Sequence, residues 1–393
     1  MAINLTNADE ALKSYYLDAV SEQLNENANP FLSIIKKTSD NVWGKEVKQL
    51  AIHGINGGIG AGTEDGNLPT ARGNHYVQFT STLKNLYGTI EISDKALKAA
   101  ENNSGAFVSL LNSEMDGLLK ASAFNFGRML FGDGSGKVSI VSIVNNDNMI
   151  MVTNTSGLIE GMVIDFRDQM GEIISGIGER EVVFVDRVNN MIKVNGSTIS
   201  FDDVSIGSII TVHGSYQNEI TGLAAIFDDN VDTLYGVSKS ANPWIKPYIQ
   251  SSVGTLTEAK LQKAIDNLEN IGGNTPDVIV TGFGVRRAIV SLLSTNRRSL
   301  DTLDIAGGFK SVSFNGIPVI ADRFCPRNTI YILNSKDFAL HQLCDWQWLT
   351  GDDGKVLRQI PGKPVYTATL VKYAELMCSR PYAQAMLTNV TEA

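Results

Sequence analysis

The stretch GINGGIGAGTEDGNLPTARGN, residues 54–74, is the part of the sequence most suggestive of chemistry, since seven of its twenty-one residues are glycine. Glycine-rich loops can bring backbone N–H groups close to a phosphate. A P-loop requires lysine after its last glycine, but Thr63 follows Gly62. A dinucleotide fingerprint starting at Gly58 is broken by the same Thr63, and Pro69 lies where a helix should run. The pattern favours a flexible hairpin tip over a nucleotide site.

Histidine and cysteine side chains are the next candidates, as metal ligands. His341 lies three residues before Cys344, and Cys325 lies sixteen residues before His341. Structural zinc sites usually show paired short spacings, which are missing here. The other histidines, His53, His75 and His213, have no ligand spacing either. Core or surface positions explain these residues better than a metal site, so we expect no metal and no cofactor.

Catalytic patterns are weak throughout the chain. No G-x-S-x-G nucleophile elbow occurs. The adjacent aspartates Asp202–Asp203, Asp228–Asp229 and Asp352–Asp353 have turn-like neighbours, which favours solvated turns over glycosidase acids or calcium ligands. We therefore expect no enzymatic activity, and a hydrolase or nucleotide enzyme built on the glycine stretch is the competing hypothesis.

One charged segment leaves two interpretations open. TNRRSLD places Arg297 and Arg298 beside Asp301 and Asp304. The segment is either an exposed polar loop or part of a ring of ion pairs between subunits.

Composition restricts the class of protein. The 393 residues are 43% hydrophobic and 19% charged, with a formal net charge of -9. This balance is globular, and its acidity argues against a nucleic-acid reader but not against a container. Three cysteines argue against a disulfide scaffold and favour synthesis in the cytoplasm. The N-terminus does not resemble a signal peptide, and no apolar run is long enough for a membrane span.

The elements around the glycine stretch are an amphipathic helix and a long hairpin. Residues 7–24 carry a helical apolar stripe, made of Leu12, Tyr15, Tyr16, Ala19, Val20 and Leu24. Two alternating segments, 45–53 and 75–83, flank the glycine stretch and predict the arms of a hairpin. Such a two-stranded ribbon is marginal alone in water, so it must lie on something, and another subunit is a natural candidate.

The rest of the chain alternates in character. A short helix capped by Ser93 and a long helix over 104–131 are expected, followed by short β-type runs in 137–214 that indicate a small barrel or sandwich. An α/β pattern covers 219–324, with Thr255 and Glu258 as a capping box, a strand DVIVT, a helix GVRRAIVSLLS, a polar loop over 294–308 and a strand GIPVIA. Further strands are expected in TIYILN, DFALHQL, WQWLT and, at unusual length, KPVYTATLVKYAELMCSRP.

This order of parts resembles the major capsid proteins of tailed bacteriophages, which have the Hong Kong 97-type shell fold. The stretches that carry the resemblance are FNGIPVIADRFCPRNTIYILN, KYAELMCSRPYAQAMLTNV and PDVIVTGFGVRRAIVSLL. The resemblance implies an α+β fold with an N-arm (1–43), an E-loop (44–92), a peripheral domain with a spine helix (93–136), an inserted β domain (137–214), an axial domain (215–325) and completion of the peripheral domain (326–393).

The resemblance also implies a function. The chain would be a structural subunit that forms hexamers and pentamers of an icosahedral head around double-stranded DNA, in the virion, after assembly in the host cytoplasm. Its partners would be a separate scaffolding protein, since the chain begins almost at the N-arm, together with a portal protein and a decoration protein. An encapsulin-type compartment is the alternative.

Candidate contacts between subunits are the tip residues and the charged segment: Gly57, Gly58, Glu64, Asp65, Arg72, Arg297, Arg298, Asp301 and Asp304. Some relatives crosslink subunits through an E-loop lysine, but residues 51–83 contain none here. Non-covalent contacts are therefore expected.

Overall fold

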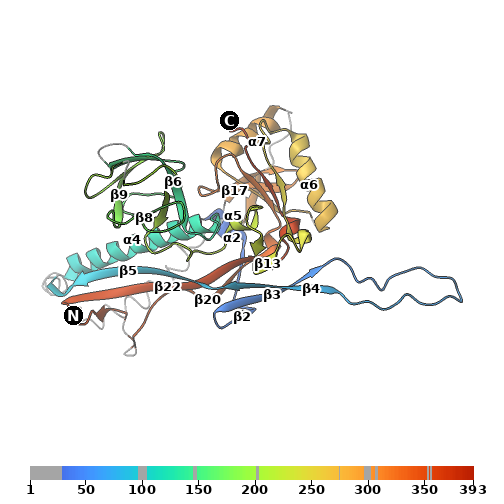
Figure 1. Cartoon of the computed structure of the whole chain (residues 1–393), viewed down its shortest axis with the longest axis horizontal. Coiled ribbons are helices and arrows are strands. Elements are labelled where there is room, and N and C mark those ends of the chain that lie inside the picture. The colour runs from blue at the N-terminus through green and yellow to red at the C-terminus, as the bar shows by residue number, and fades with distance from the viewer. Residues whose placement is uncertain are drawn as a thin grey trace.

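The computed structural model describes residues 29–95, 104–144, 148–200, 203–273, 275–295, 302–305, 309–351, 354 and 356–393. It consists of a long sheet with a long helix along it, a barrel, an α/β unit, and a two-stranded ribbon that extends from the body (Figure 1). The expected helix over 7–24 lies outside the described residues. None of the described helices is long and apolar enough to cross a membrane.

The long sheet is centred on β22 (Val365–Cys378), the unusually long strand expected from the sequence. It pairs antiparallel with β20 (Phe338–Trp348), β5 (Lys84–Ser93) and β21 (Arg358–Gln359), while β1 (Lys36–Thr38) pairs parallel with β20. Helix α4 (Ser104–Leu130) runs along this sheet (Figure 1) and packs on it through Met115, Leu119 and Phe126.

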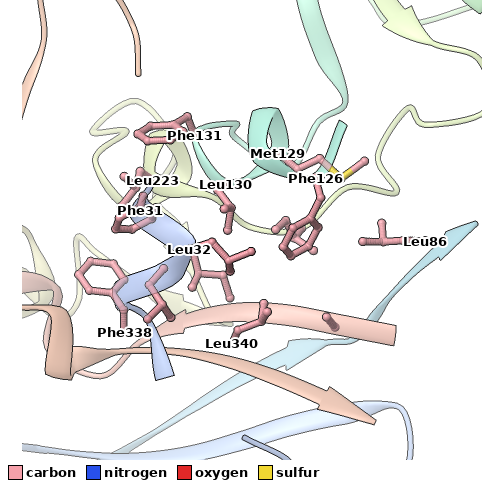
Figure 2. Packing of buried hydrophobic residues seen from close by; sticks show 14 of the residues in the cluster. Phe31, Leu32, Leu86, Phe126, Met129, Leu130, Phe131, Leu223, Phe338 and Leu340 are labelled. Atoms are coloured by element: carbon pink, nitrogen blue, oxygen red, sulfur yellow. The ribbon is translucent and has the colours of Figure 1, made fainter. Parts of the chain in front are cut away.

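The end of α4 meets the short helix α2 (Pro30–Ile34) in the main hydrophobic core (Figure 2). Phe31 lies between two rings, with its centroid 5.5 Å from that of Phe131 and 6.0 Å from that of Phe338. Phe31 and Leu32 are fully buried. Residues 29–38, assigned to an N-arm in the sequence, are therefore packed on the body of their own subunit.

A closed six-stranded barrel follows α4, and of the two arrangements left open by the sequence it excludes the sandwich. Its strands are β6 (Lys137–Val144), β7 (Met149–Val152), β8 (Val163–Arg167), β9 (Arg180–Asp186), β10 (Met191–Val194) and β11 (Ile209–Val212). Its interior is a separate core of alternating residues that includes Val141, Ile164 and Ile192. Whether the barrel is an independent domain, as the division of the chain above assumes, stays a prediction.

The α/β unit is a mixed seven-stranded sheet with helices α6 (Glu258–Gly272) and α7 (Phe283–Thr295). Its strands, in sheet order, are β14 (Tyr248–Gln250), β23 (Ala385–Leu387), β19 (Ile330–Leu333), β15 (Val278–Thr281), β18 (Ile317–Ala321), β17 (Phe309–Phe314) and β16 (Thr302–Ile305). The remaining short elements are α5 (Leu223–Ile226), β12 (Thr233–Leu234), β13 (Val237–Ser238), and the 3-10 turns η2 (Pro243–Ile245), η3 (Ser335–Asp337) and η4 (Pro381–Ala383).

Three local expectations were wrong. Helix α6 is capped by Thr257, whose side chain accepts a hydrogen bond from the Lys260 N–H, and not by Thr255. Part of the expected polar loop is strand β16, because it pairs with β17. The two strands expected around 337–350 are one strand, β20, with register shifts near Cys344. Strand β5, which ends at Ser93, was not expected from the sequence, whereas the helix expected to follow Ser93 does begin at Asp94.

Candidate assembly surface

The ribbon comprises β3 (Glu46–His53), the loop 54–74 and β4 (His75–Thr82). The strands pair antiparallel from Glu46–Thr82 to His53–His75, and β2 (Val42–Trp43) joins β3 at the base. In Figure 1 the ribbon projects far beyond the rest of the chain. Its strands agree with the two arms expected from the alternating sequence.

One face of the ribbon base is packed against its own subunit. Val47, Ala51 and Phe79 alternate along this inner face and are buried. The Phe79 ring lies 5.7 Å from the Tyr235 ring and 6.4 Å from that of Trp244. Through these contacts the base of the ribbon packs on an apolar surface of its own subunit.

Tyr235 connects this apolar surface to the long sheet. It occupies the turn between β12 and β13 with Gly236, and both residues have positive φ, as a tight hairpin turn requires. Its carbonyl accepts a hydrogen bond from the Thr80 N–H at 2.9 Å. Its hydroxyl donates to the Leu376 carbonyl and accepts from the Cys378 N–H on β22. Burial raises the pKa of Tyr235 well above its usual value, so the hydroxyl keeps its proton.

The outer face of the ribbon strands is exposed, and its part next to the loop is apolar. Leu50 and Ile52 are 60% and 54% exposed, and Ile52 lies opposite Tyr76, which is 52% exposed. The same character continues into the loop with Ile55, Ile59 and Leu68, the last 90% exposed. Single exposed apolar residues are ordinary, but a continuous series on an extended element is typical of an interaction surface.

The glycines of the loop allow its two limbs to lie close together. A side chain on Gly60 would begin 3.3 Å from the Pro69 ring, and one on Gly58 would begin 3.3 Å from the Arg72 nitrogen. Only Gly54 of these seven glycines has a positive φ. The glycines therefore act mainly by permitting close approach of the two limbs. This role is more specific than the general flexibility that the sequence predicted for the loop.

The structure places the sequence-selected residues in two separate regions. Gly57, Gly58, Glu64, Asp65 and Arg72 all lie in the ribbon loop, where Arg72 packs its aliphatic part opposite Gly57. Asp304 lies in β16 of the seven-stranded sheet, with Lys310 as its cross-strand partner. Arg297, Arg298 and Asp301 lie outside the described residues. As contacts between subunits, all nine remain predictions.

Candidate metal ligands are dispersed. His53 and His75 stack at the end of the ribbon strands, with ring centroids 5.3 Å apart. His341 is buried and its Nδ1 lies 2.8 Å from the Asp40 carbonyl oxygen, while burial lowers its pKa. Within the described part of the chain, no three His, Cys, Asp or Glu residues form a group that could hold a metal ion.

Buried charged side chains hold residues 219–221, where the chain leaves the barrel, against neighbouring elements. Arg128 near the end of α4 makes a two-point ion pair with Glu219, with one contact at 3.0 Å. Two residues on, the Thr221 N–H donates to the Glu375 carboxylate on β22 at 2.7 Å. Burial raises the pKa of Glu375 to about 7. These groups join α4, the barrel exit and β22.

Sequence reasoning missed the residues that seat the ribbon, Tyr235 and Trp244. The pair Tyr-Gly between two short β-prone segments was an available signal for the turn, but nothing local indicates what the tyrosine contacts. The exposed outer face was missed as well, although Leu50 and Ile52 make both faces of β3 apolar in the sequence.

Residues 208–354 match the family model described as SU10 major capsid protein, which covers the barrel exit, much of the α/β unit and β20. No curated protein matches the chain in sequence. The fold is similar to that of a chain in the Cyanophage A-1(L) capsid asymmetric unit, with 13% identity, 94% of each chain covered and a TM-score of 0.59.

Two further solved structures match with lower TM-scores. A structure of Mycobacterium phage Bobi matches at 8% identity over 100% of both chains, with a TM-score of 0.48. The holo-SrpI encapsulin complex from Synechococcus elongatus PCC 7942 matches at 10% identity over 93% of this chain and 89% of its own, with a TM-score of 0.46.

The whole-chain likeness to the cyanophage capsid confirms the shell fold expected from the resemblance. The encapsulin alternative is not favoured, because the family match is to a phage capsid protein. The family match and the shared fold together support a structural shell protein of the kind that tailed phages use as their major capsid protein.

Proposed function

We propose that this chain forms the icosahedral head that encloses phage double-stranded DNA, as hexamers and pentamers held by non-covalent contacts. The exposed outer face of the ribbon supplies the principal contact with a neighbouring subunit. The observation that carries this proposal is the division of the ribbon into a buried inner face and an exposed apolar outer face. Repeated modest contacts around a closed symmetry make a strong assembly.

The N-terminal segment that is left to contact neighbouring subunits is shorter than the N-arm expected over residues 1–43. Residues 29–38 pack on their own subunit, where β1 pairs with β20. We therefore assign contact with neighbours to residues before Asn29. The tip residues Glu64, Asp65 and Arg72 are exposed and carry opposite charges, which suits salt-sensitive contacts between subunits.

The role is structural and not enzymatic, and the working location is the virion capsid after assembly in the host cytoplasm. A separate scaffolding protein, a portal protein and a decoration protein are the proposed further partners. With a net charge of -9 the chain does not attract packaged DNA, which suits a wall that lets the DNA move.

Electron microscopy of the purified protein, alone and with its gene neighbours, tests the proposal. We expect capsomers or closed shells, filled with DNA only in the infected host. The double variant Leu50→Ser, Ile52→Ser should keep the folded subunit and reduce shell yield at least tenfold.

The matched control is Met170→Ser, Val188→Ser, which removes two exposed apolar side chains from the barrel. This control should assemble normally. Shells that form equally well from the ribbon variant would refute the assigned contact, and a stable monomer with nucleotide affinity would refute the shell function.

A further inference from the structure

Four arginines line a pocket between the barrel and the α/β unit. The pocket has a volume of about 460 Å³, and its lining joins residues beside the barrel strands to the start of α7 and the segment after β18. Its arginines are Arg187, Arg287, Arg323 and Arg327, and all four are exposed. In a chain with a formal net charge of -9, this concentration of guanidinium groups reverses the overall charge locally.

Two of these guanidinium groups have partners in their own subunit. Arg187 forms an ion pair with Glu160, with 3.5 Å between nitrogen and oxygen. The Arg287 Nε–H donates to the Ala393 carbonyl oxygen at 2.7 Å. These two arginines shape the rim of the pocket, and their charge is already partly used.

The other two arginines make no ion pair within the described part of the chain. Arg323 lies over the rings of Phe124 and Phe324, at 5.0 Å and 5.1 Å from their centroids, which positions its charge without neutralising it. The Arg327 side chain is exposed and has no hydrogen bond or ion pair to a described residue. Both charges are therefore available to an anion that enters the pocket.

The start of α7 adds backbone donors to the pocket. Gly282 and Gly284 line it where this thirteen-residue helix begins, and the first N–H groups of a helix have no partner within the helix. The Glu392 side chain lies directly against Gly284, so a carboxylate is already accommodated at the positive end of the helix dipole. The second carboxylate of the lining, Asp322, is buried and accepts hydrogen bonds from backbone N–H groups.

The apex of the ribbon carries charge of the opposite sign. Glu64 and Asp65 occupy the two central positions of a β-turn, in which the Gly66 N–H donates to the Thr63 carbonyl at 3.1 Å. Both side chains are exposed at the midpoint of the loop 54–74. The next charged residue, Arg72, follows seven positions after Asp65. The outermost turn of the ribbon therefore presents two adjacent carboxylates.

The apex lies far from the pocket of its own subunit. In Figure 1 the ribbon runs away from the barrel and its loop ends beyond α6, whereas the pocket lies between the barrel and α7. A contact between apex and pocket therefore needs a second copy of the chain. Every copy carries both halves of this contact, so each subunit can receive one apex and supply another.

We propose that the acidic turn 63–66 of one subunit enters the arginine pocket of a neighbouring subunit, where Glu64 and Asp65 pair with Arg323 and Arg327. Arginine and carboxylate groups match in geometry and can form two parallel hydrogen bonds. Exposed ion pairs contribute little affinity each, but they fix which surfaces meet and in what register. The inference rests on the proposed role of the ribbon in assembly and adds the surface that receives its apex.

Charge reversal on each side tests the pairing. Asp65→Arg and Arg327→Glu, each alone, should lower shell yield at least fivefold, because each places like charges together. The combined variant restores opposite charges and should recover at least half of the unmodified yield. Lys263→Glu is the matched control, since it reverses an exposed cation on α6 outside the pocket, and it should assemble normally.

Binding to the isolated subunit separates this contact from shell formation. A labelled synthetic peptide of residues 57–72, cyclised to keep the turn, should bind the full-length subunit at low salt, as measured by fluorescence anisotropy. Arg327→Glu should weaken this binding at least tenfold, and a peptide with Asp65→Arg should bind that variant better than it binds the unmodified subunit.

The two measurements distinguish the possible failures. Peptide binding with the expected charge dependence, in a chain that forms no shells, would refute the shell function and support the pairing. Shells that tolerate both reversals, or that the combined variant does not restore, would overturn the pairing and leave the shell function intact. Binding of inorganic phosphate in the pocket without binding of the peptide would identify a site for a free anion and overturn the pairing as well.

Discussion

The two faces of the ribbon are made from the same pair of strands but have opposite surroundings. On the inner face, Phe79 is buried against Tyr235 and Trp244 of its own subunit. On the outer face, Leu50 and Ile52 are exposed, as are the apolar side chains of the loop. Both faces belong to one continuous register, so backbone hydrogen bonding does not distinguish them. The difference teaches that the inner face contributes to folding of the subunit, while the outer face is free to contribute to assembly.

The strongest test of this division is removal of the buried ring at the base. Phe79→Ala should lower the free energy of unfolding by about 3–5 kcal/mol, because it leaves a cavity between Tyr235 and Trp244. Denaturant unfolding of the isolated subunit measures this loss. A change below about 1 kcal/mol would mean that the base is not part of the folded core.

The strand behind the base provides a pH test. Burial raises the pKa of Glu375 to about 7, above its unfolded value of 4.5. The folded state therefore favours the protonated carboxyl, and the resulting stability is complete below pH 4.5 and lost as the pH rises through 7.

Glu375→Gln keeps an acceptor for the Thr221 N–H and removes the titration. At pH 8 it should be more stable than the unmodified chain by up to about 3 kcal/mol, and at pH 4.5 the two should be similar. Parallel denaturant curves at both values measure the difference, and an equal pH response in both chains would contradict the assignment.

Removing the hydroxyl that links the ribbon base to the long sheet should have a smaller effect on the free energy of unfolding. Tyr235→Phe keeps the ring against Phe79 but leaves the Cys378 N–H and the Leu376 carbonyl without the hydroxyl. We expect a loss of about 1–3 kcal/mol. Amide exchange at Cys378 should also accelerate. If exchange accelerated only in the α/β unit, the hydroxyl would not be the link.

The outer face should show the smallest effect on folding. Leu50→Ser, Ile52→Ser should change the free energy of unfolding by no more than about 0.5 kcal/mol, because both side chains are already exposed. Thermal unfolding of the subunit at a fixed low concentration measures this. A large loss here would erase the distinction between the two faces, whatever the result for assembly.

Local sequence was sufficient for elements whose pattern is internal. The alternation in β3 and β4, the long alternating run of β22 and the buried run of β15 are each visible in a short window. Strand β5 was missed because its partner β22 lies nearly three hundred residues later. The contact of Tyr235 with Phe79 could not be predicted for the same reason, because the two residues are far apart in the sequence.

Prediction of the candidate site was limited in the same way, to features visible in local sequence. Sequence identified the exposed tip, since a glycine-rich segment between alternating arms has few other structures. It did not identify the arginine pocket, because Arg187, Arg287 and Arg327 come from three distant segments and only the fold brings them together. The close approach of Gly60 to Pro69 likewise depends on how the two limbs run.

Only one residue, Leu83, separates β4 of the ribbon from β5 of the long sheet. It is buried, and its N–H donates to the Lys45 carbonyl at 2.9 Å. The second strand of the ribbon therefore continues into the long sheet without a flexible linker. The direction in which the ribbon leaves the body is set by the ten-residue register of β5 with β22.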